Sequence, residues 1–160
     1  MELKTISVMK PDSVNLILGQ THFIKSVEDL YEAVVQAVPG VKFGVAFCEA
    51  SGPCLIRHTG TDAELEKLAI DAAAAIGAGH VFVIMLGNIF PINVLNQIKS
   101  VAEVCGVFCA TANPVRVVVA CEGEDRGVLG VIDGSAPKGI EGEKEQGERR
   151  AMLRRFGYKQ

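Results

Sequence analysis

The sequence predicts an α/β protein built as one layered domain. The apolar run from His80 to Leu86 is rich in β-branched and aromatic residues and is too short for a helix, which is typical of a strand covered on both faces. Helical patterns flank it over Asp62–Ile76 and Pro91–Val101. Because alternation of helix, strand and helix is typical of layered α/β domains, we expect this run to be the central strand.

Composition limits the size and the class of the protein. A chain of 160 residues is long enough for one domain with a real core and too short for two. Its net charge of -3 argues against nucleic-acid binding. The N-terminus has no signal-peptide pattern and no apolar run reaches the length of a membrane span, so we expect a cytoplasmic protein without membrane contact.

The five cysteines are predicted to be reduced core residues. They lie singly in apolar, strand-like runs, and their odd number and the lack of C-x-x-C spacing argue against a disulfide framework and against a zinc site. The five are Cys48, Cys54, Cys105, Cys109 and Cys121.

The first part of the chain is predicted to form a hairpin and a helix. Lys4–Met9 and Asn15–Gly19 are its strands, with turn residues between them. Ser26 is predicted as the N-cap of a helix that ends at Pro39-Gly40.

A second hairpin joins Lys42–Glu49 to Cys54–His58. Thr61–Glu64 matches a capping box, in which the threonine oxygen accepts the amide of the third helical residue. The helix that begins there is expected to end at Gly77 or Gly79 in the left-handed conformation.

The second half of the chain is predicted to add three strands and a C-terminal helix. The strands are Gly106–Thr111, Val115–Cys121 and Gly127–Asp133. Residues 134–147 are predicted to be a loop that leads to a helix at 148–156.

His80 is the first candidate for chemistry. The chain lacks the phosphate-binding G-x-x-x-x-G-K-[ST] and G-x-G-x-x-G motifs and the hydrolase motif G-x-S-x-G. An imidazole next to glycines can be approached by a bulky anion and accepts phosphoryl groups at neutral pH. The alternative is a structural histidine bonded to a backbone carbonyl at the strand edge. The preceding helix end also presents carbonyls, which repel phosphate. His22 and His58 are interpreted as structural.

Two further clusters are candidates for ligand binding. The amides of Asn88, Asn93 and Asn96 could bind a purine edge or a ribose, or could serve as turn and exposed helix residues. After the last strand, the carboxylates of Asp133 and Glu141 could hold a metal such as Mg²⁺ or accept a hydroxyl proton, and Lys138 could face a phosphate. The alternative is a solvated loop.

Several longer segments of the sequence match one family. They are Gly77-Ala-Gly-His80, Phe90–Lys99, Phe108–Pro114, Gly130–Gly134, Pro137-Lys-Gly139 and the closing Gly-Tyr-Lys. With these segments the chain resembles the adenosine-specific kinase family of archaea and thermophilic bacteria over nearly its whole length. The resemblance implies a three-layer α/β/α sandwich, which we expect to contain a mixed sheet. It also implies a homo-oligomer, expected to be a trimer or hexamer, binding of adenosine or AMP in preference to ADP and ATP, and a histidine that carries phosphate.

The leading hypothesis is a phosphotransferase acting on adenosine. His80, in the matching Gly-Ala-Gly-His segment, would carry the phosphoryl group, and the phosphate donor is unknown. The Asn88–Asn96 region and Asn113 would bind the nucleoside, while Asp133, Lys138 and Glu141 would handle the hydroxyl and the phosphate. The alternative is a non-catalytic sensor of adenosine or AMP.

A geometric constraint accompanies this hypothesis. Seven strand steps, about 23 Å, separate His80 from Gly87. If His80 and Asn88 serve one site, that site lies between subunits.

Overall fold

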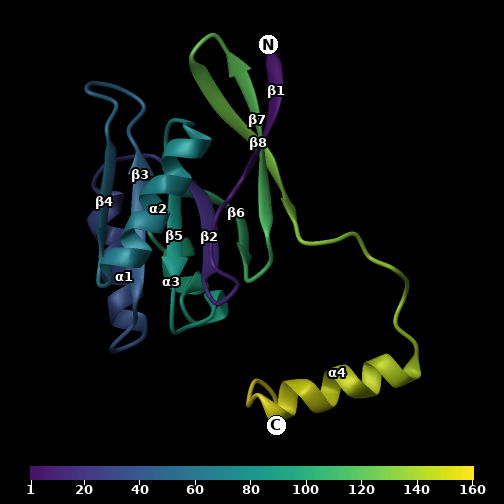
Figure 1. Ribbon diagram of the computed structural model, residues 1–160. Coiled ribbons are helices and arrows are strands. Elements are labelled where there is room, and N and C mark those ends of the chain that lie inside the picture. The colour runs from purple at the N-terminus through teal and green to yellow at the C-terminus, as the bar shows by residue number, and fades with distance from the viewer.

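The computed structural model describes residues 1–160 and contains two β-sheets and four α-helices (Figure 1). The elements are β1 Glu2–Ser7, β2 Asn15–Thr21, α1 Ser26–Ala37, β3 Phe43–Cys48, β4 Ile56–Gly60, α2 Ala63–Ile76, β5 Val81–Leu86, the 3-10 turn η1 Pro91–Asn93, α3 Leu95–Lys99, β6 Val104–Thr111, β7 Val115–Glu122, β8 Asp125–Asp133 and α4 Glu143–Arg155. The α/β class is confirmed.

The larger sheet has the strand order β4-β3-β5-β2-β6. All six residues of β5 are buried and this strand is central, as the sequence predicts. The prediction of a mixed sheet is wrong, because every pair of neighbouring strands is antiparallel. Helix α1 joins β2 to β3, and β5 lies between those two strands; α2 joins β4 to β5, with β3 between them. Each helix therefore connects parallel strands that are not neighbours.

Layers form on both faces of this sheet. Alternate residues such as Ile17, Phe47 and Ile84 pack against α1 and α3, because side chains alternate between the two faces of a strand. Their neighbours Leu18 and Met85 pack on the other face, against α2 and the valines of β7. The second outer layer is therefore shared between α2 and the smaller sheet β1-β7-β8 (Figure 1).

The predicted N-terminal hairpin is wrong. Strand β1 pairs with β7 in the smaller sheet, whereas β2 lies between β5 and β6 in the larger one. Five of six residues in β1 are exposed, while six of seven in β2 are buried, so the two strands suit different environments. The second hairpin, β3 with β4, is confirmed.

Both predicted helix caps are shifted by one residue. Ser26 is the first residue of α1 instead of its N-cap, and its hydroxyl accepts from Thr21 inside the protein. Asp62 caps α2 by accepting from the amides of Glu64 and Leu65 at 3.1 and 3.2 Å. The predicted cap Thr61 instead donates to a carbonyl across the loop, that of Val41, at 2.7 Å. A carboxylate at the next position can reach the same amides, which frees the threonine for this contact.

The C-terminal segment differs most from expectation. Helix α4 begins at Glu143, five residues before the predicted start, because Glu145 accepts from the Gly142 amide at 2.9 Å and closes the first turn. Residues 134–160, here called the C-terminal arm, run away from the sheets before the chain turns back (Figure 1). No residue of α4 is buried.

Two smaller findings complete the fold. All five cysteines are free, but Cys54 and Cys105 are exposed, so the prediction of five core cysteines holds only for the other three. None of the helices combines the length and the apolar character needed to cross a membrane.

Candidate functional site

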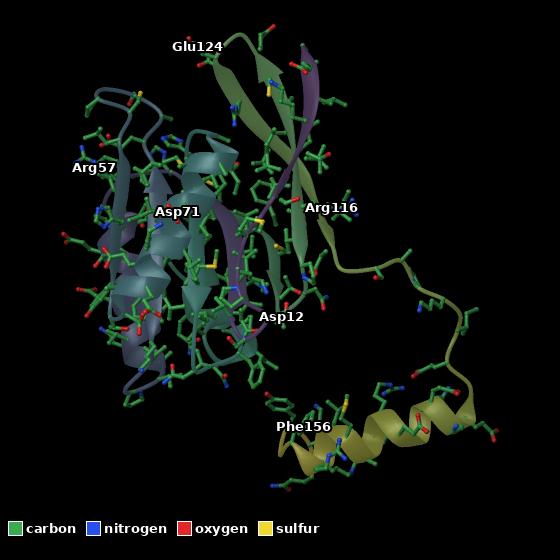
Figure 2. The ribbon with its side chains drawn as sticks, viewed as in Figure 1. Asp12, Arg57, Asp71, Arg116, Glu124 and Phe156 are labelled. Carbon is green, nitrogen blue, oxygen red and sulfur yellow. The ribbon has the colours of Figure 1, made fainter.

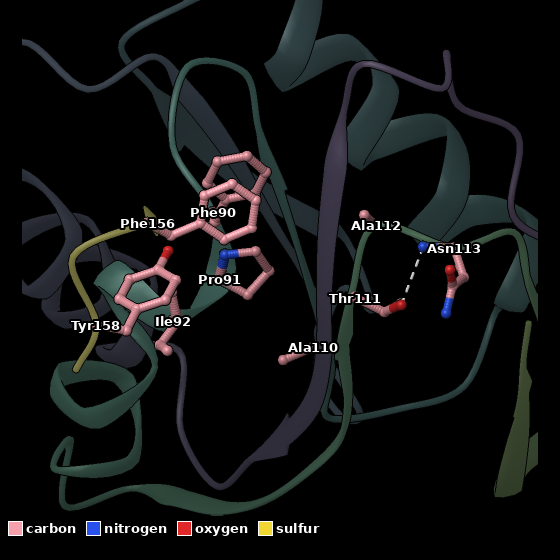
Figure 3. Close-up of a pocket in the computed structure, with 9 residues that line it drawn as sticks. All are labelled: Phe90, Pro91, Ile92, Ala110, Thr111, Ala112, Asn113, Phe156 and Tyr158. Atoms are coloured by element: carbon pink, nitrogen blue, oxygen red, sulfur yellow. Dashed lines mark hydrogen bonds between the residues drawn. The ribbon is translucent and has the colours of Figure 1, made fainter. Parts of the chain in front are cut away.

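A cavity of about 630 Å³ lies where η1, the end of β6 and the chain terminus meet (Figure 3). We call it the aromatic pocket. Its lining residues are Phe90, Pro91, Ile92, Ala110, Thr111, Ala112, Asn113, Phe156 and Tyr158. Its volume is in the range of small-molecule sites.

One side of the aromatic pocket is apolar and carries three aromatic rings. Phe90 is 59% exposed. Phe156 and Tyr158 come from the end of the C-terminal arm, and their rings lie edge to face with centroids 6.4 Å apart. Such a wall suits a flat aromatic ligand.

Two polar residues of the lining, Thr111 and Asn113, bond to the carboxylate of Asp133, which is not itself a lining residue. Thr111 donates its hydroxyl to Asp133 Oδ1 at 2.8 Å, and the Asn113 amide donates to the same oxygen at 3.1 Å. The two strands that carry Thr111 and Asp133 end at the same edge, because Asp133 pairs with Val115 just beyond the β6–β7 turn. Gly134 follows with a φ of +65°, and a Cβ there would lie 2.9 Å from the Asn113 side-chain nitrogen. Glycine is thus required where the chain leaves this cluster.

Cys109 is a buried thiol close to this cluster and is not a nucleophile at neutral pH. Burial raises its pKa to about 11, and the negative charge of Asp133 adds to the increase. A thiol with such a pKa stays protonated at neutral pH. It is therefore unreactive, because the thiolate is the nucleophilic form.

The backbone of His80 is held by hydrogen bonds, whereas its ring nitrogens make none. Its φ is +63°, an uncommon value for a residue with a side chain. Its amide donates to the Cys48 carbonyl at 2.8 Å, and its carbonyl accepts from Thr21 at 2.9 Å. The half-buried imidazole stacks on Phe47 with centroids 6.0 Å apart and meets the edge of His22 at 6.3 Å. No hydrogen bond engages either ring nitrogen, so both remain available for chemistry.

His80 does not reach the aromatic pocket of its own chain. Thr111, in the pocket wall, pairs with Leu16, which pairs with Met85. Met85 is five strand steps from His80, a distance of about 17 Å. His80 therefore lies toward one end of the larger sheet, whereas Asp133, a residue of the smaller sheet, bonds to Thr111 toward the other end.

The predicted asparagines have different positions. Asn113 lies in the aromatic pocket. Asn88 accepts from the Lys42 amide at 2.7 Å and donates to the Gly40 carbonyl at 3.1 Å, so it connects two loops. Asn93 accepts from the Phe90 amide at 3.0 Å and closes η1. Asn96 lies in a separate surface hollow between α1 and α3.

Lys138 and Glu141 lie on the C-terminal arm. Glu141 accepts two bonds from Arg149, at 2.7 and 3.0 Å, and this hydrogen bonding lowers the pKa of Glu141. No group of three or more His, Cys, Asp and Glu side chains is placed to hold a metal ion.

Of the nine lining residues, only Asn113 is among the predicted site residues, and the missed ones include Thr111, Phe90, Phe156 and Tyr158. Phe90, Thr111 and Tyr158 lie within the sequence segments that carry the family resemblance. Their roles were hidden because the pocket joins three segments that are far apart in the chain.

Comparison with known proteins identifies relatives of the whole chain. A family described as adenosine specific kinase matches residues 6–159. The crystal structure of the PH1918 protein from Pyrococcus horikoshii OT3 is similar, with 47% sequence identity and a TM-score of 0.94. The match covers 99% of this chain and 98% of that one. No match was found among curated proteins.

Proposed function

The chain belongs to the adenosine-specific kinase family, and from this we infer that it binds adenosine and AMP in the aromatic pocket and acts on adenosine as a phosphotransferase. The observation that carries the proposal is the pocket, which three aromatic rings line together with Thr111 and Asn113, the two side chains that bond to Asp133. A nucleoside has a flat base and a hydroxyl-bearing ribose, and these two parts match the two sides of the pocket.

In the proposed complex the base stacks on the aromatic side. Stacking of a base on an aromatic side chain contributes about 1–3 kcal/mol. The Asn113 side-chain nitrogen donates to Asp133, and the side-chain oxygen of Asn113 can accept a hydrogen bond from the amino group of adenine. Asp133 Oδ1 already accepts two bonds, which leaves its second oxygen for a ribose hydroxyl.

The proposed transfer takes place in two steps. In the first step, the lone pair of one His80 nitrogen, which no protein group occupies, attacks the terminal phosphorus of a phosphoanhydride donor. A P–N bond forms, the P–O anhydride bond breaks, and the shortened phosphate chain of the donor leaves with the electron pair. The ribose hydroxyl oxygen then attacks phosphorus while Asp133 takes the hydroxyl proton. The P–N bond breaks, its electron pair goes to the ring nitrogen, and the imidazole, protonated on its other nitrogen, leaves as a neutral ring.

Because His80 lies too far from the pocket of its own chain, we propose that a second copy supplies it. The C-terminal arm supports a homo-oligomer, expected to be a trimer or hexamer. No residue of α4 is buried, and Ile140 in the extended part of the arm is 99% exposed. Apolar side chains on an extended segment are typical of arms that pack on a partner.

Replacement of His80 by alanine tests the proposal against the alternative of a non-catalytic sensor. That alternative is favoured by the distance between His80 and the pocket of the same chain. We expect wild-type protein to bind adenosine and to transfer labelled phosphate to it, and His80→Ala to bind with unchanged affinity and to transfer none. Calorimetry measures binding, and a radiolabelled nucleotide donor measures transfer. Reducing buffer is used because all five cysteines are free and we expect a cytoplasmic protein.

His58→Ala is the matched control, since His58 is a surface histidine held by Glu66. It should retain both binding and transfer. Binding without transfer in the wild type would favour the sensor. Transfer by His80→Ala at the wild-type rate would exclude His80 as the phosphoryl carrier.

Removal of the C-terminal arm should dissociate the oligomer. A chain ending at Asp133 loses the exposed apolar residues of the arm but keeps both sheets, so we expect it to fold and to elute as a monomer. Size-exclusion chromatography with light scattering measures its mass. Ile140→Asp should weaken assembly in the full chain, whereas Lys144→Asp, at an exposed α4 position, should not. A monomeric wild type at micromolar concentration would contradict the proposal.

A further inference from the structure

A lysine outside the predicted site lies at the wall of the aromatic pocket. Lys10 Nζ donates to the Ala112 carbonyl at 3.0 Å, across a separation of 102 residues in the chain. Ala112 and its neighbour Asn113 both line the pocket. We propose that Lys10 binds the 5′-phosphate of a nucleoside monophosphate seated there. This inference rests on the proposed function and assigns the residue that distinguishes AMP from adenosine.

The loop that carries Lys10 is anchored on both sides. The Val8 amide donates to the Val115 carbonyl at 3.0 Å, and the Val14 amide donates to the Pro11 carbonyl at 3.0 Å. Val8 and Val14 are themselves buried. Figure 2 shows Asp12, in this loop, at the end of the molecule toward which Phe156 turns. The ammonium of Lys10 is thus held near the pocket instead of moving freely in solvent.

The charge of Lys10 is available to a ligand. Lys10 takes part in none of the eight ion pairs of the structure. An ammonium has three donors, and Ala112 accepts one of them. Asp12 lies two residues along the loop and forms no ion pair with Lys10, and Asp133 Oδ1 is occupied by Thr111 and Asn113.

Lys138, which the sequence suggested for this task, is less suited to it. It lies in the extended segment of the C-terminal arm that leads away from the sheets (Figure 1). It takes part in none of the eight ion pairs of the structure. Lys10 instead contacts the pocket wall directly. In the proposed complex, the ribose of AMP binds Asp133, and its 5′-phosphate lies on the side of the pocket where Lys10 contacts the wall.

The test compares the dissociation constants of adenosine and AMP by calorimetry on the full chain. Lys10→Met should weaken AMP binding about tenfold or more, because a charge-assisted hydrogen bond is lost, and leave adenosine binding within about twofold. Lys10→Arg should retain AMP binding. Lys4→Met is the control for the loss of one positive charge. Lys4 lies opposite Val119, four residues along β7 from Val115, and so away from the pocket. It should change neither constant.

The outcomes separate this inference from the proposed function. If the wild type binds neither ligand, the proposed function fails. If it binds both, and Lys10→Met lowers both affinities equally or neither, only the role of Lys10 is overturned. Melting temperatures of the variants check folding, and a Lys10→Arg variant that loses AMP as strongly as Lys10→Met would also overturn the inference. Weaker AMP binding at higher salt in the wild type, with a smaller salt effect in Lys10→Met, supports it.

Discussion

Replacing Gly44 with alanine should lower the free energy of unfolding by about 3 kcal/mol or more. Gly44 lies on β3 where α2 crosses the sheet, and a Cβ there would be 2.3 Å from the Cα and the amide nitrogen of Glu66. Backbone atoms cannot rotate aside as a side chain can. Helix α2 would have to lift from β3 and loosen the core around Leu65 and Ala69. Urea denaturation followed by circular dichroism measures the loss.

Gly106→Ala is the matched control for this substitution. Gly106 is also a strand residue, on β6, but no atom lies within 4 Å of an added Cβ. Its replacement should change stability by no more than about 0.5 kcal/mol. Equal stabilities of the two variants would show that α2 is not held tightly against β3.

Much of the secondary structure could be predicted from local patterns, but the strand arrangement could not. The run Val81–Leu86 is apolar on both faces, and this alone indicates a central buried strand. A helix joins two strands of the sheet, and a third strand can lie between them. The strand order depends on which strand takes that position. In this fold β5 lies between β2 and β3, and the local sequence contains no information about such a long-range pairing.

The candidate site was predicted in parts. Asp133 and Asn113 were singled out separately, and the structure brings them to one hydrogen-bonded cluster. The aromatic side was missed because Phe156 and Tyr158 lie in a charged tail that resembles a surface helix. Lys10 was missed because turn chemistry explained it fully. Local sequence thus indicated the chemical groups, whereas the shared pocket depends on contacts between distant segments.

Replacing Asp133 with asparagine should reduce phosphoryl transfer to adenosine about 100-fold or more, while the dissociation constant of adenosine changes by less than about threefold. The amide oxygen of asparagine can still accept from Thr111 and Asn113, so the polar side of the pocket keeps its shape. An amide cannot take the proton of the ribose hydroxyl, so only the transfer step loses its base. The radiolabel assay and calorimetry on the same preparation measure the two quantities.

Glu141→Gln controls for the loss of one negative charge, since Glu141 is held by Arg149 on the C-terminal arm and makes no contact with Asp133. It should leave transfer unchanged, with at most a small loss of stability from the exposed ion pair. Asp133→Ala, which removes the acceptor of both Thr111 and Asn113, should also weaken adenosine binding. If Asp133→Asn transfers phosphate at the wild-type rate, Asp133 is not the base, and its role is limited to holding the side chains that line the pocket.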